Sequence, residues 1–269
     1  MRTLLHAFLA AVVAALLPAA ASAQSEPKIG VVVMHGKGGA PNSRPIAPFA
    51  AALERNGFLV ANLEMPWSGA RNYDVDVMAA ERQVKEALDA LRGKGAEKLF
   101  VSGHSQGGVF AIHVASRVPV DGIIAIAPGG SVSSRVFREK LGESLEEARR
   151  HVAGGKGAEK QRLADYEGSR GTYSVVAVPQ AYVTWFDPEG AMNVIRAAKA
   201  VPASLPVLYV APTRDYLGLR NTRQQVFGSL PANPHSRLYE PDADHLQAPV
   251  ATVDEMTRWM REVASKRGG

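Results

Sequence analysis

Short apolar runs alternate with amphipathic stretches along most of the chain, and this alternation predicts its architecture. The apolar runs predict strands over residues 29–34, 58–63, 99–101, 122–127, 205–210 and 236–240. Apolar residues at helical spacing predict helices over residues 45–56, 76–92, 106–117, 219–227 and 252–266. Strands joined by crossover helices indicate an α/β fold, with a doubly wound, mainly parallel sheet of about six strands and helices on both faces.

One long segment interrupts this alternation. Residues 131–200 are polar, contain a helical stretch around residues 134–152 and a Gly-rich turn at 154–157, and include an aromatic-rich run from Tyr173 to Phe186. Ligands of open parallel sheets bind beyond the carboxyl ends of the strands. An insertion after the fourth strand would lie at that end. We therefore expect a single domain over residues 24–269, with a helical lid at about residues 131–200.

The first residues have the pattern of a signal peptide. Arg2 precedes an apolar stretch from Leu4 to Leu17, and Ala21-Ser22-Ala23 fits an A-x-A cleavage site. The apolar stretch is short for a membrane span, and Pro18 follows it. We expect residues 1–23 to be removed, the mature chain to start at Gln24 in the periplasm or the medium, and no stable membrane anchoring after cleavage.

Composition excludes several classes of function. The chain of 269 residues has no cysteine and a formal net charge of +5, which removal of Arg2 lowers by one. Its basic residues are scattered and accompany no nucleic-acid-reading motif, so no nucleic-acid partner is expected. Disulfides and thiolate metal sites require cysteine, and neither H-x-x-x-H nor a carboxylate cluster is present. We therefore expect no metal and no cofactor.

The segment from Lys98 to Phe110 carries the candidate chemistry. A short apolar strand leads into Gly103-His104-Ser105-Gln106-Gly107, and an apolar-periodic helix follows. This is the G-x-S-x-G pattern in the strand–turn–helix context that lifts a serine hydroxyl above the end of a strand. Small residues flank the serine because a larger side chain would strike the neighbouring strand or the substrate.

In this motif, and in the order of its other polar residues, the chain resembles the α/β-hydrolase family over nearly its whole mature length. The resemblance implies an acid after the strand that follows the lid and a histidine after the last strand. Asp215 and His245 occupy these positions. The resemblance also implies backbone oxyanion donors at Gln106 and, within His35-Gly-Lys-Gly-Gly39, at Lys37.

Ser105, Asp215 and His245 would then form a catalytic triad. The imidazole accepts the serine proton during attack and later protonates the leaving group, while the acid fixes the imidazole tautomer. Of the seven histidines, only His245 follows the last predicted strand. Other acids remain open as alternatives to Asp215, namely Asp187, Asp242 and Asp244.

The sequence thus predicts a serine hydrolase that cleaves a small-molecule carboxylic ester through an acyl-enzyme. Four aromatic residues are candidates for the lining of an apolar substrate pocket: Trp67, Tyr182, Trp185 and Phe186. Thioester hydrolysis, amide or peptide cleavage and lipid deacylation use the same triad and stay open. The alternatives from other classes are a ligand-binding protein on a hydrolase scaffold and a carrier of an acylated partner.

Overall fold

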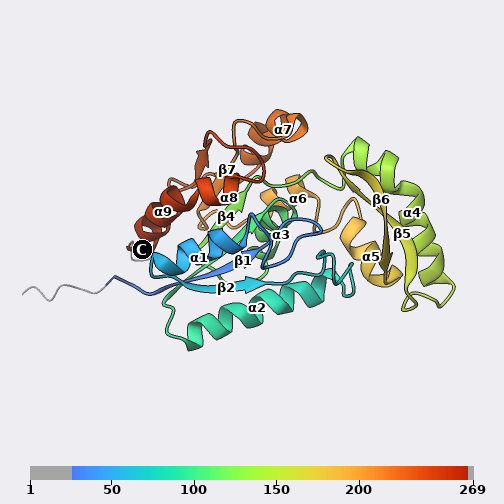
Figure 1. Cartoon of the computed structure of the whole chain (residues 1–269), viewed down its shortest axis with the longest axis horizontal. Helices are drawn as coiled ribbons and strands as arrows, with labels where there is room; N and C mark the ends of the chain where they lie inside the picture. Colours follow the sequence, from blue (N-terminus) through green and yellow to red (C-terminus); the bar gives the residue numbers. More distant parts are fainter. Residues whose placement is uncertain (1–25, 266–269) are drawn as a thin grey trace, which may run out of the picture.

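A six-stranded sheet forms the centre of the molecule, whose computed structural model describes residues 26–265 (Figure 1). The strands lie in the order β2-β1-β3-β4-β7-β8, and every neighbouring pair is parallel. The predicted fold class is therefore confirmed. The predicted signal peptide, residues 1–23, lies outside the described residues. The strand bounds are β1 Ile29–Met34, β2 Leu59–Leu63, β3 Lys98–His104, β4 Gly122–Ile126, β7 Val207–Val210 and β8 Arg237–Tyr239.

Burial on both faces explains why the central strands are continuous apolar runs. Every residue of β1, β4 and β7 is buried. Alternate residues of β1 point into two separate cores, Val32 into one and Val31 and Val33 into the other. A parallel sheet covered by helices on both sides needs apolar residues at every position of its inner strands.

Helices cover both faces of the sheet (Figure 1). The first core contains residues of α2, α3 and α6, and the second contains residues of α1, α8 and α9. Asp76 caps α2 by accepting a hydrogen bond from the Ala79 N–H at 2.7 Å, as its place before the helix leads us to expect. The bounds are α1 Ala47–Arg55, α2 Val77–Gly93, α3 Gln106–Val114, α6 Val194–Lys199, α7 Leu217–Phe227, α8 Ala248–Ala251 and α9 Val253–Ser265.

The insertion forms a lobe beyond the carboxyl ends of the strands (Figure 1). It contains α4 Arg135–Ala153, the antiparallel pair β5 Gln161–Glu167 and β6 Gly171–Ala177, and α5 Pro179–Phe186. The observed α4 agrees with the predicted helix, but the hairpin was not predicted. Leu163 and Asp165 are buried while Arg162 is exposed, so the strand has a period of two that the polar composition of the segment conceals.

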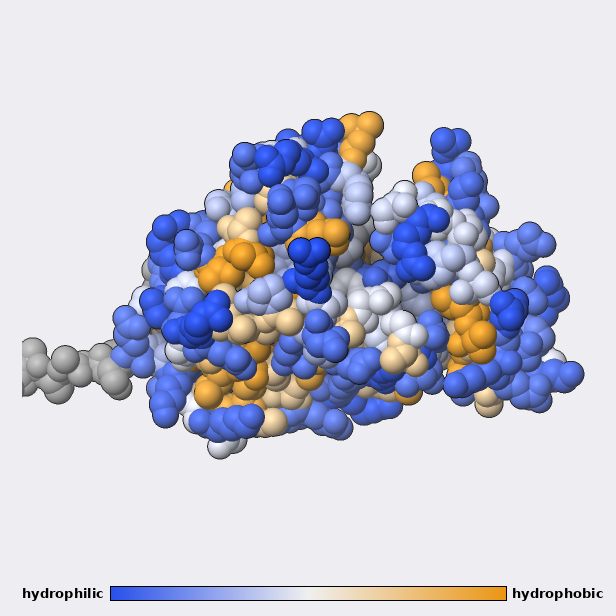
Figure 2. Space-filling view, in the orientation of Figure 1, coloured by the Kyte–Doolittle hydropathy of each residue, from blue (hydrophilic) through white to orange (hydrophobic). Residues whose placement is uncertain are grey.

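The surface in Figure 2 is mainly hydrophilic, with hydrophobic patches between the polar areas. A notch in this surface separates the region of α7 from the upper end of α4. Asp215 and Tyr216 lie immediately before α7 in the chain. Between residues 26 and 265, no helix has the length and apolar character that crossing a membrane requires.

Candidate active site

Ser105 lies in a sharp turn between the end of β3 and the start of α3. This turn, Gly103–Gly107, is called the elbow below. The φ of 55° and ψ of −117° at Ser105 are unfavourable for a residue with a side chain, and such strain is common at functional sites. The glycines two residues away on each side permit the close packing of this turn. A Cβ atom at Gly103 would lie 2.0 Å from the Gly107 carbonyl oxygen, and one at Gly107 would lie 2.5 Å from the Met34 carbonyl oxygen.

His245 and Asp215 are paired at the same edge of the sheet. Nδ1 of His245, in the loop after β8, lies 2.8 Å from Oδ1 of Asp215, in the loop after β7. Both side chains are buried, and the Tyr216 N–H donates to the same carboxylate oxygen at 2.7 Å. Because a carboxylate accepts, Nδ1 donates, so in the neutral form of the ring Nε2 is the basic nitrogen.

The other acids weighed from the sequence have different partners. Asp187 accepts a hydrogen bond from the Glu189 N–H, and the carboxylate of Asp242 pairs with Arg214 at 2.8 Å. Asp244 accepts backbone N–H groups of the two residues that follow His245. Chain order and the hydrogen bond of His245 therefore both favour Asp215 as the orienting acid.

His104 contacts His245, which sequence reasoning did not anticipate. Its Nε2 donates to the backbone carbonyl oxygen of His245 at 2.9 Å, and the two rings lie 4.7 Å apart. Burial, and secondarily the charge of His245, lower the pKa of His104 to about 3. His104 thus acts as a neutral donor that holds the His245 loop against the elbow, one residue before Ser105. The partners are 141 positions apart, so no local sequence signal exists for this contact.

The reacting atoms of the candidate triad are free of other partners. Across residues 26–265, neither Oγ of Ser105 nor Nε2 of His245 has a hydrogen-bonding partner. Ser105 is partly exposed, whereas His245 is 7% exposed. Catalytic hydrogen bonds are often long before substrate binds and shorten in the complex.

The loop after β1, His35–Gly39, lies directly against the elbow. A Cβ atom on Gly36 would lie 3.1 Å from Cβ of Ser105. The backbone N–H groups of Lys37 and Gln106 donate to no acceptor in the described part of the chain. Two unpaired N–H groups beside a strained serine are the components that an oxyanion hole requires.

His35 holds this loop as a neutral imidazole. The Met65 N–H donates to Nε2 of His35 at 3.0 Å, so the ring proton lies on Nδ1, which donates to the Gly36 carbonyl oxygen at 2.7 Å. Burial lowers the pKa of His35, so the neutral form is favoured. The Trp67 indole N–H donates to the His35 carbonyl oxygen at 2.8 Å and ties the loop to the segment after β2.

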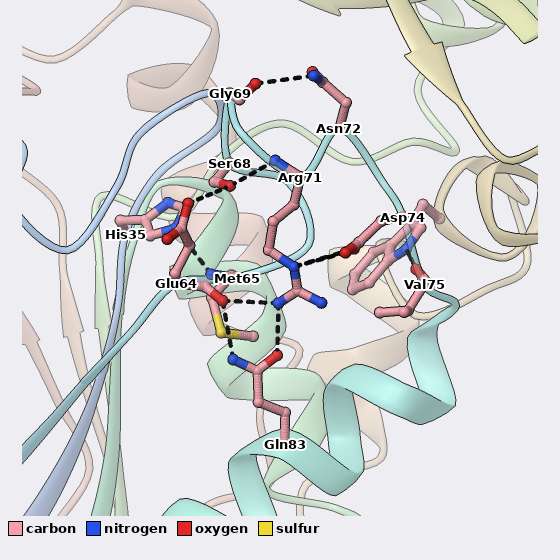
Figure 3. A network of polar contacts seen from close by, with 11 residues as sticks. His35, Glu64, Met65, Ser68, Gly69, Arg71, Asn72, Asp74, Val75 and Gln83 are labelled. Atoms are coloured by element: carbon pink, nitrogen blue, oxygen red, sulfur yellow. Dashed lines mark hydrogen bonds and ion pairs between the residues drawn. The ribbon is translucent and has the colours of Figure 1, made fainter. Parts of the chain in front are cut away.

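Figure 3 shows how that segment, residues 64–76, is itself fixed. Arg71 reaches Asp74 through Nε at 3.1 Å, and through Nη1 the Glu64 carbonyl oxygen and the Gln83 side chain, each at 2.8 Å. The Ser68 hydroxyl donates to the Glu64 carboxylate at 3.0 Å. The segment that carries Met65 and Trp67, which both donate hydrogen bonds to His35, is therefore held in place by these contacts.

The four predicted pocket residues divide into two groups. Trp67, Tyr182 and Trp185 are at most 2% exposed and belong to the core, where their rings pack edge to face with other aromatic rings. Phe186 is 5% exposed and belongs to the same core, but it also lines a cavity of about 290 Å³ in the insertion. Of the four predicted residues, only Phe186, at the end of α5, lies on the cavity wall.

This cavity is mainly apolar and lies beside the His35–Gly39 loop. Its wall is formed by α4 and by residues just before it, at the end of α5 and just after α5: Val132, Phe137, Arg138, Leu141, Gly142, Leu145, Glu146, Arg149, Phe186 and Pro188. Nζ of Lys37 lies 5.5 Å from the ring centre of Phe137 and 5.3 Å from that of Phe186. A bound apolar group would therefore lie near the side chain of Lys37, while neither Ser105 nor His245 is part of the cavity wall.

Within the described residues, no group of three or more His, Cys, Asp or Glu side chains is arranged to hold a metal ion. The chemistry that this arrangement supports is nucleophilic attack by a serine, with a histidine as base and an aspartate that orients it.

Comparison with known protein families gives a match over most of the chain. The family described as serine aminopeptidase, S33, matches residues 25–246. No curated protein gives a significant match to the sequence.

Many solved structures share the fold. A monoacylglycerol lipase of Paleococcus ferrophilus is 18% identical, with a TM-score of 0.61, over 87% of this chain and 94% of the lipase chain. A carboxyl esterase of Bacillus coagulans is 15% identical, with a TM-score of 0.60, over 88% and 89%. Est1E of Butyrivibrio proteoclasticus with bound ferulic acid is 16% identical, with a TM-score of 0.60, over 90% and 91%. At these identities the likeness shows the fold alone.

Proposed function

The chain belongs to the serine aminopeptidase S33 family of α/β-hydrolases, and from this membership we propose that it cleaves a carboxylic ester through an acyl-enzyme on Ser105. The observation that carries the proposal is the 2.8 Å hydrogen bond between the buried His245 and Asp215. His104, which precedes the elbow serine, holds the backbone of His245 at that position. These contacts support a triad in which Ser105 is the nucleophile, His245 the base and Asp215 the orienting acid.

In the proposed reaction, Oγ of Ser105 attacks the ester carbonyl carbon and Nε2 of His245 takes the hydroxyl proton. The carbonyl oxygen becomes an oxyanion, which the backbone N–H groups of Gln106 and Lys37 stabilise. Collapse breaks the bond to the alcohol oxygen, which receives the proton from His245. Water then attacks the acyl-enzyme in the same manner, releasing the carboxylic acid and restoring Ser105.

The cavity favours an uncharged apolar group over the amino terminus of a peptide. An aminopeptidase has to pair the substrate ammonium with a carboxylate in its pocket, because an unpaired buried charge is costly. The only acid on the cavity wall, Glu146, already pairs with Arg149 at 2.5 Å. A volume of about 290 Å³ is at the lower end for small-molecule pockets, which supports a short or medium acyl or alcohol group.

Hydrolysis of a series of p-nitrophenyl esters, from acetate to palmitate, tests this function on residues 24–269. We expect turnover that is best with short or medium chains and that falls by at least about a thousandfold in Ser105→Ala, because the nucleophile is lost. Unchanged circular dichroism of Ser105→Ala would show that its fold is intact. Turnover retained by that variant would contradict the proposal, and binding of esters without turnover would favour the ligand-binding protein.

Matched thioester and amide substrates of the best chain length distinguish ester hydrolysis from thioester and amide hydrolysis.

We also propose that the protein acts after export, because its first residues have the pattern of a signal peptide with a cleavage site after Ala23.

A further inference from the structure

Asp165 is a buried acid for which the proposed reaction has no direct use. It lies on β5 of the insertion, far in sequence from every candidate catalytic residue, and its side chain is 1% exposed. A carboxylate this deeply buried is costly unless donors surround it. The hydrogen-bond donors around Asp165 show which segments of the chain the carboxylate connects.

Four donors from three different segments converge on this carboxylate. Oδ1 accepts from Nζ of Lys37 at 2.5 Å and from the Tyr166 N–H at 2.7 Å. Oδ2 accepts from the hydroxyls of Tyr73 at 2.7 Å and Tyr173 at 3.1 Å. Burial is the main cause that raises the pKa of both tyrosines, so both phenols keep the protons that they donate. Asp165 therefore joins the insertion to the loops after β1 and β2.

The side chain of Lys37 has further contacts in the insertion besides its ion pair with Asp165. Its ammonium also donates to the Tyr166 carbonyl oxygen at 3.0 Å and lies over the rings of Phe137 and Phe186. The lysine side chain is only 11% exposed. An ammonium with a carboxylate, a carbonyl group and two aromatic faces around it has one well-defined position.

The backbone N–H of this same lysine is the second oxyanion donor of the proposed reaction. On the carbonyl side, the Gly36–Lys37 peptide is held by hydrogen bonds from His35 Nδ1 and the Gly39 N–H to the Gly36 oxygen. On the other side of Lys37, the Gly38 N–H donates to the Trp67 carbonyl oxygen at 2.9 Å, and Gly38 has a φ of +64°. The side chain of Lys37 adds a third anchor to this stretch, and it is the anchor that comes from the insertion.

We propose that Asp165 is a positioning residue that, through its ion pair with Lys37, orients the Lys37 backbone N–H for oxyanion stabilisation. This inference rests on the proposed function. The insertion would then complete the catalytic site of the core: with β5 in place the Lys37 N–H is held toward the oxyanion, and without Asp165 the loop loses its side-chain anchor and the N–H is less precisely oriented. A misdirected donor reduces the stabilisation of the transition state and leaves substrate binding in the ground state unchanged.

Three variants of the mature protein test this role: Asp165→Asn, Lys37→Met and the double variant. The double variant removes both charges together, so it avoids the stability loss that follows when one member of a buried pair is left alone. The control is Tyr173→Phe, which removes one donor from the same carboxylate without touching Lys37. Each kcat is calculated per active site, and the fraction of active sites is measured by titration with a fluorophosphonate.

We expect kcat per active site to fall at least about tenfold in all three variants, with KM within about twofold, because one oxyanion donor contributes about a hundredfold or more. The double variant should lose no more than either single variant, since both changes release the same anchor. Tyr173→Phe should keep the wild-type kcat.

A kcat per active site within twofold of the wild type in the double variant would overturn the positioning role, as would a rise in KM alone. A loss of titratable sites or of thermal stability at unchanged kcat per site would identify a merely structural ion pair. If the wild type itself neither turns over esters nor reacts with the fluorophosphonate, the proposed function fails, and this inference with it.

Discussion

At the scale of single residues, three buried histidines of the candidate site differ in the hydrogen-bonding partners of their ring nitrogens, and this difference indicates their roles. His245 donates from Nδ1 to Asp215 and keeps Nε2 available as a base. His104 donates from Nε2 to the backbone of His245, and His35 donates from Nδ1 to the backbone of Gly36. Because burial lowers the pKa of both His104 and His35, these two stay neutral and act as fixed donors.

The low pKa of His104 predicts a loss of stability on acidification. In the unfolded chain a histidine titrates near its ordinary pKa of 6.5, whereas folded His104 titrates at about 3. Between these pH values the unfolded state binds the additional proton, so stability falls as the pH is lowered. From pH 7 to pH 5 His104 should account for about 2 kcal/mol of the unfolding free energy.

Urea unfolding of the wild type and His104→Gln at pH 7 and pH 5 measures this contribution. Glutamine keeps an N–H donor near the position of Nε2 but takes up no proton in this range. We expect the variant to lose about 2 kcal/mol less on acidification than the wild type. His35 contributes in the same direction in both proteins, so the difference isolates His104. Equal losses in the two proteins would contradict a buried, neutral His104.

At the scale of elements, the elbow depends on how closely α3 approaches β1 and β3. Gly107, in the first turn of α3, packs against the carbonyl groups at the end of β1, and Gly103, near the end of β3, packs against Gly107. Backbone atoms cannot move aside as the end of a flexible side chain can. The two glycines therefore set the spacing that holds Ser105 in its strained conformation.

Gly107→Ala tests this spacing. The added Cβ would lie 2.5 Å from the Met34 oxygen and 2.7 Å from the His35 oxygen, so α3 has to shift. Such overpacking costs about 1–3 kcal/mol, which should lower Tm by at least about 3 °C and reduce ester turnover.

The matched control is Gly93→Ala, at the exposed end of α2, where an added Cβ meets no atom within 4 Å. The control should leave Tm unchanged or slightly higher, because alanine favours helix over glycine by up to about 1 kcal/mol. Equal Tm values for the two variants would show that close approach at Gly107 does not limit packing.

At the scale of the whole molecule, the parallel sheet brings distant segments of the chain to one edge. Ser105 follows β3, Asp215 follows β7, His245 follows β8, and Lys37 follows β1. The insertion lies over this edge and contacts it through Asp165 (Figure 1). The loop that carries Lys37 is therefore contacted by the insertion as well as by the core, which is the basis of the positioning role proposed for Asp165.

The sequence predicted those features that depend on local pattern. Buried strands such as β1 appear as continuous apolar runs, and the elbow has a short motif whose glycines are required by sterics. The hairpin β5–β6 was missed because its alternation lies within a polar segment. The contacts of Lys37 with Asp165 and of His104 with His245 join residues 128 and 141 positions apart. Such contacts follow from tertiary packing, which no local pattern records.

The most direct test of the account is reaction of residues 24–269 with a fluorophosphonate, followed by peptide mass spectrometry, in the wild type and in His245→Gln. A nucleophilic serine activated by histidine should carry a single adduct on Ser105, formed at least about a thousandfold more slowly in His245→Gln. The absence of an adduct, an adduct on another residue, or an equal rate in the variant would contradict the proposed triad.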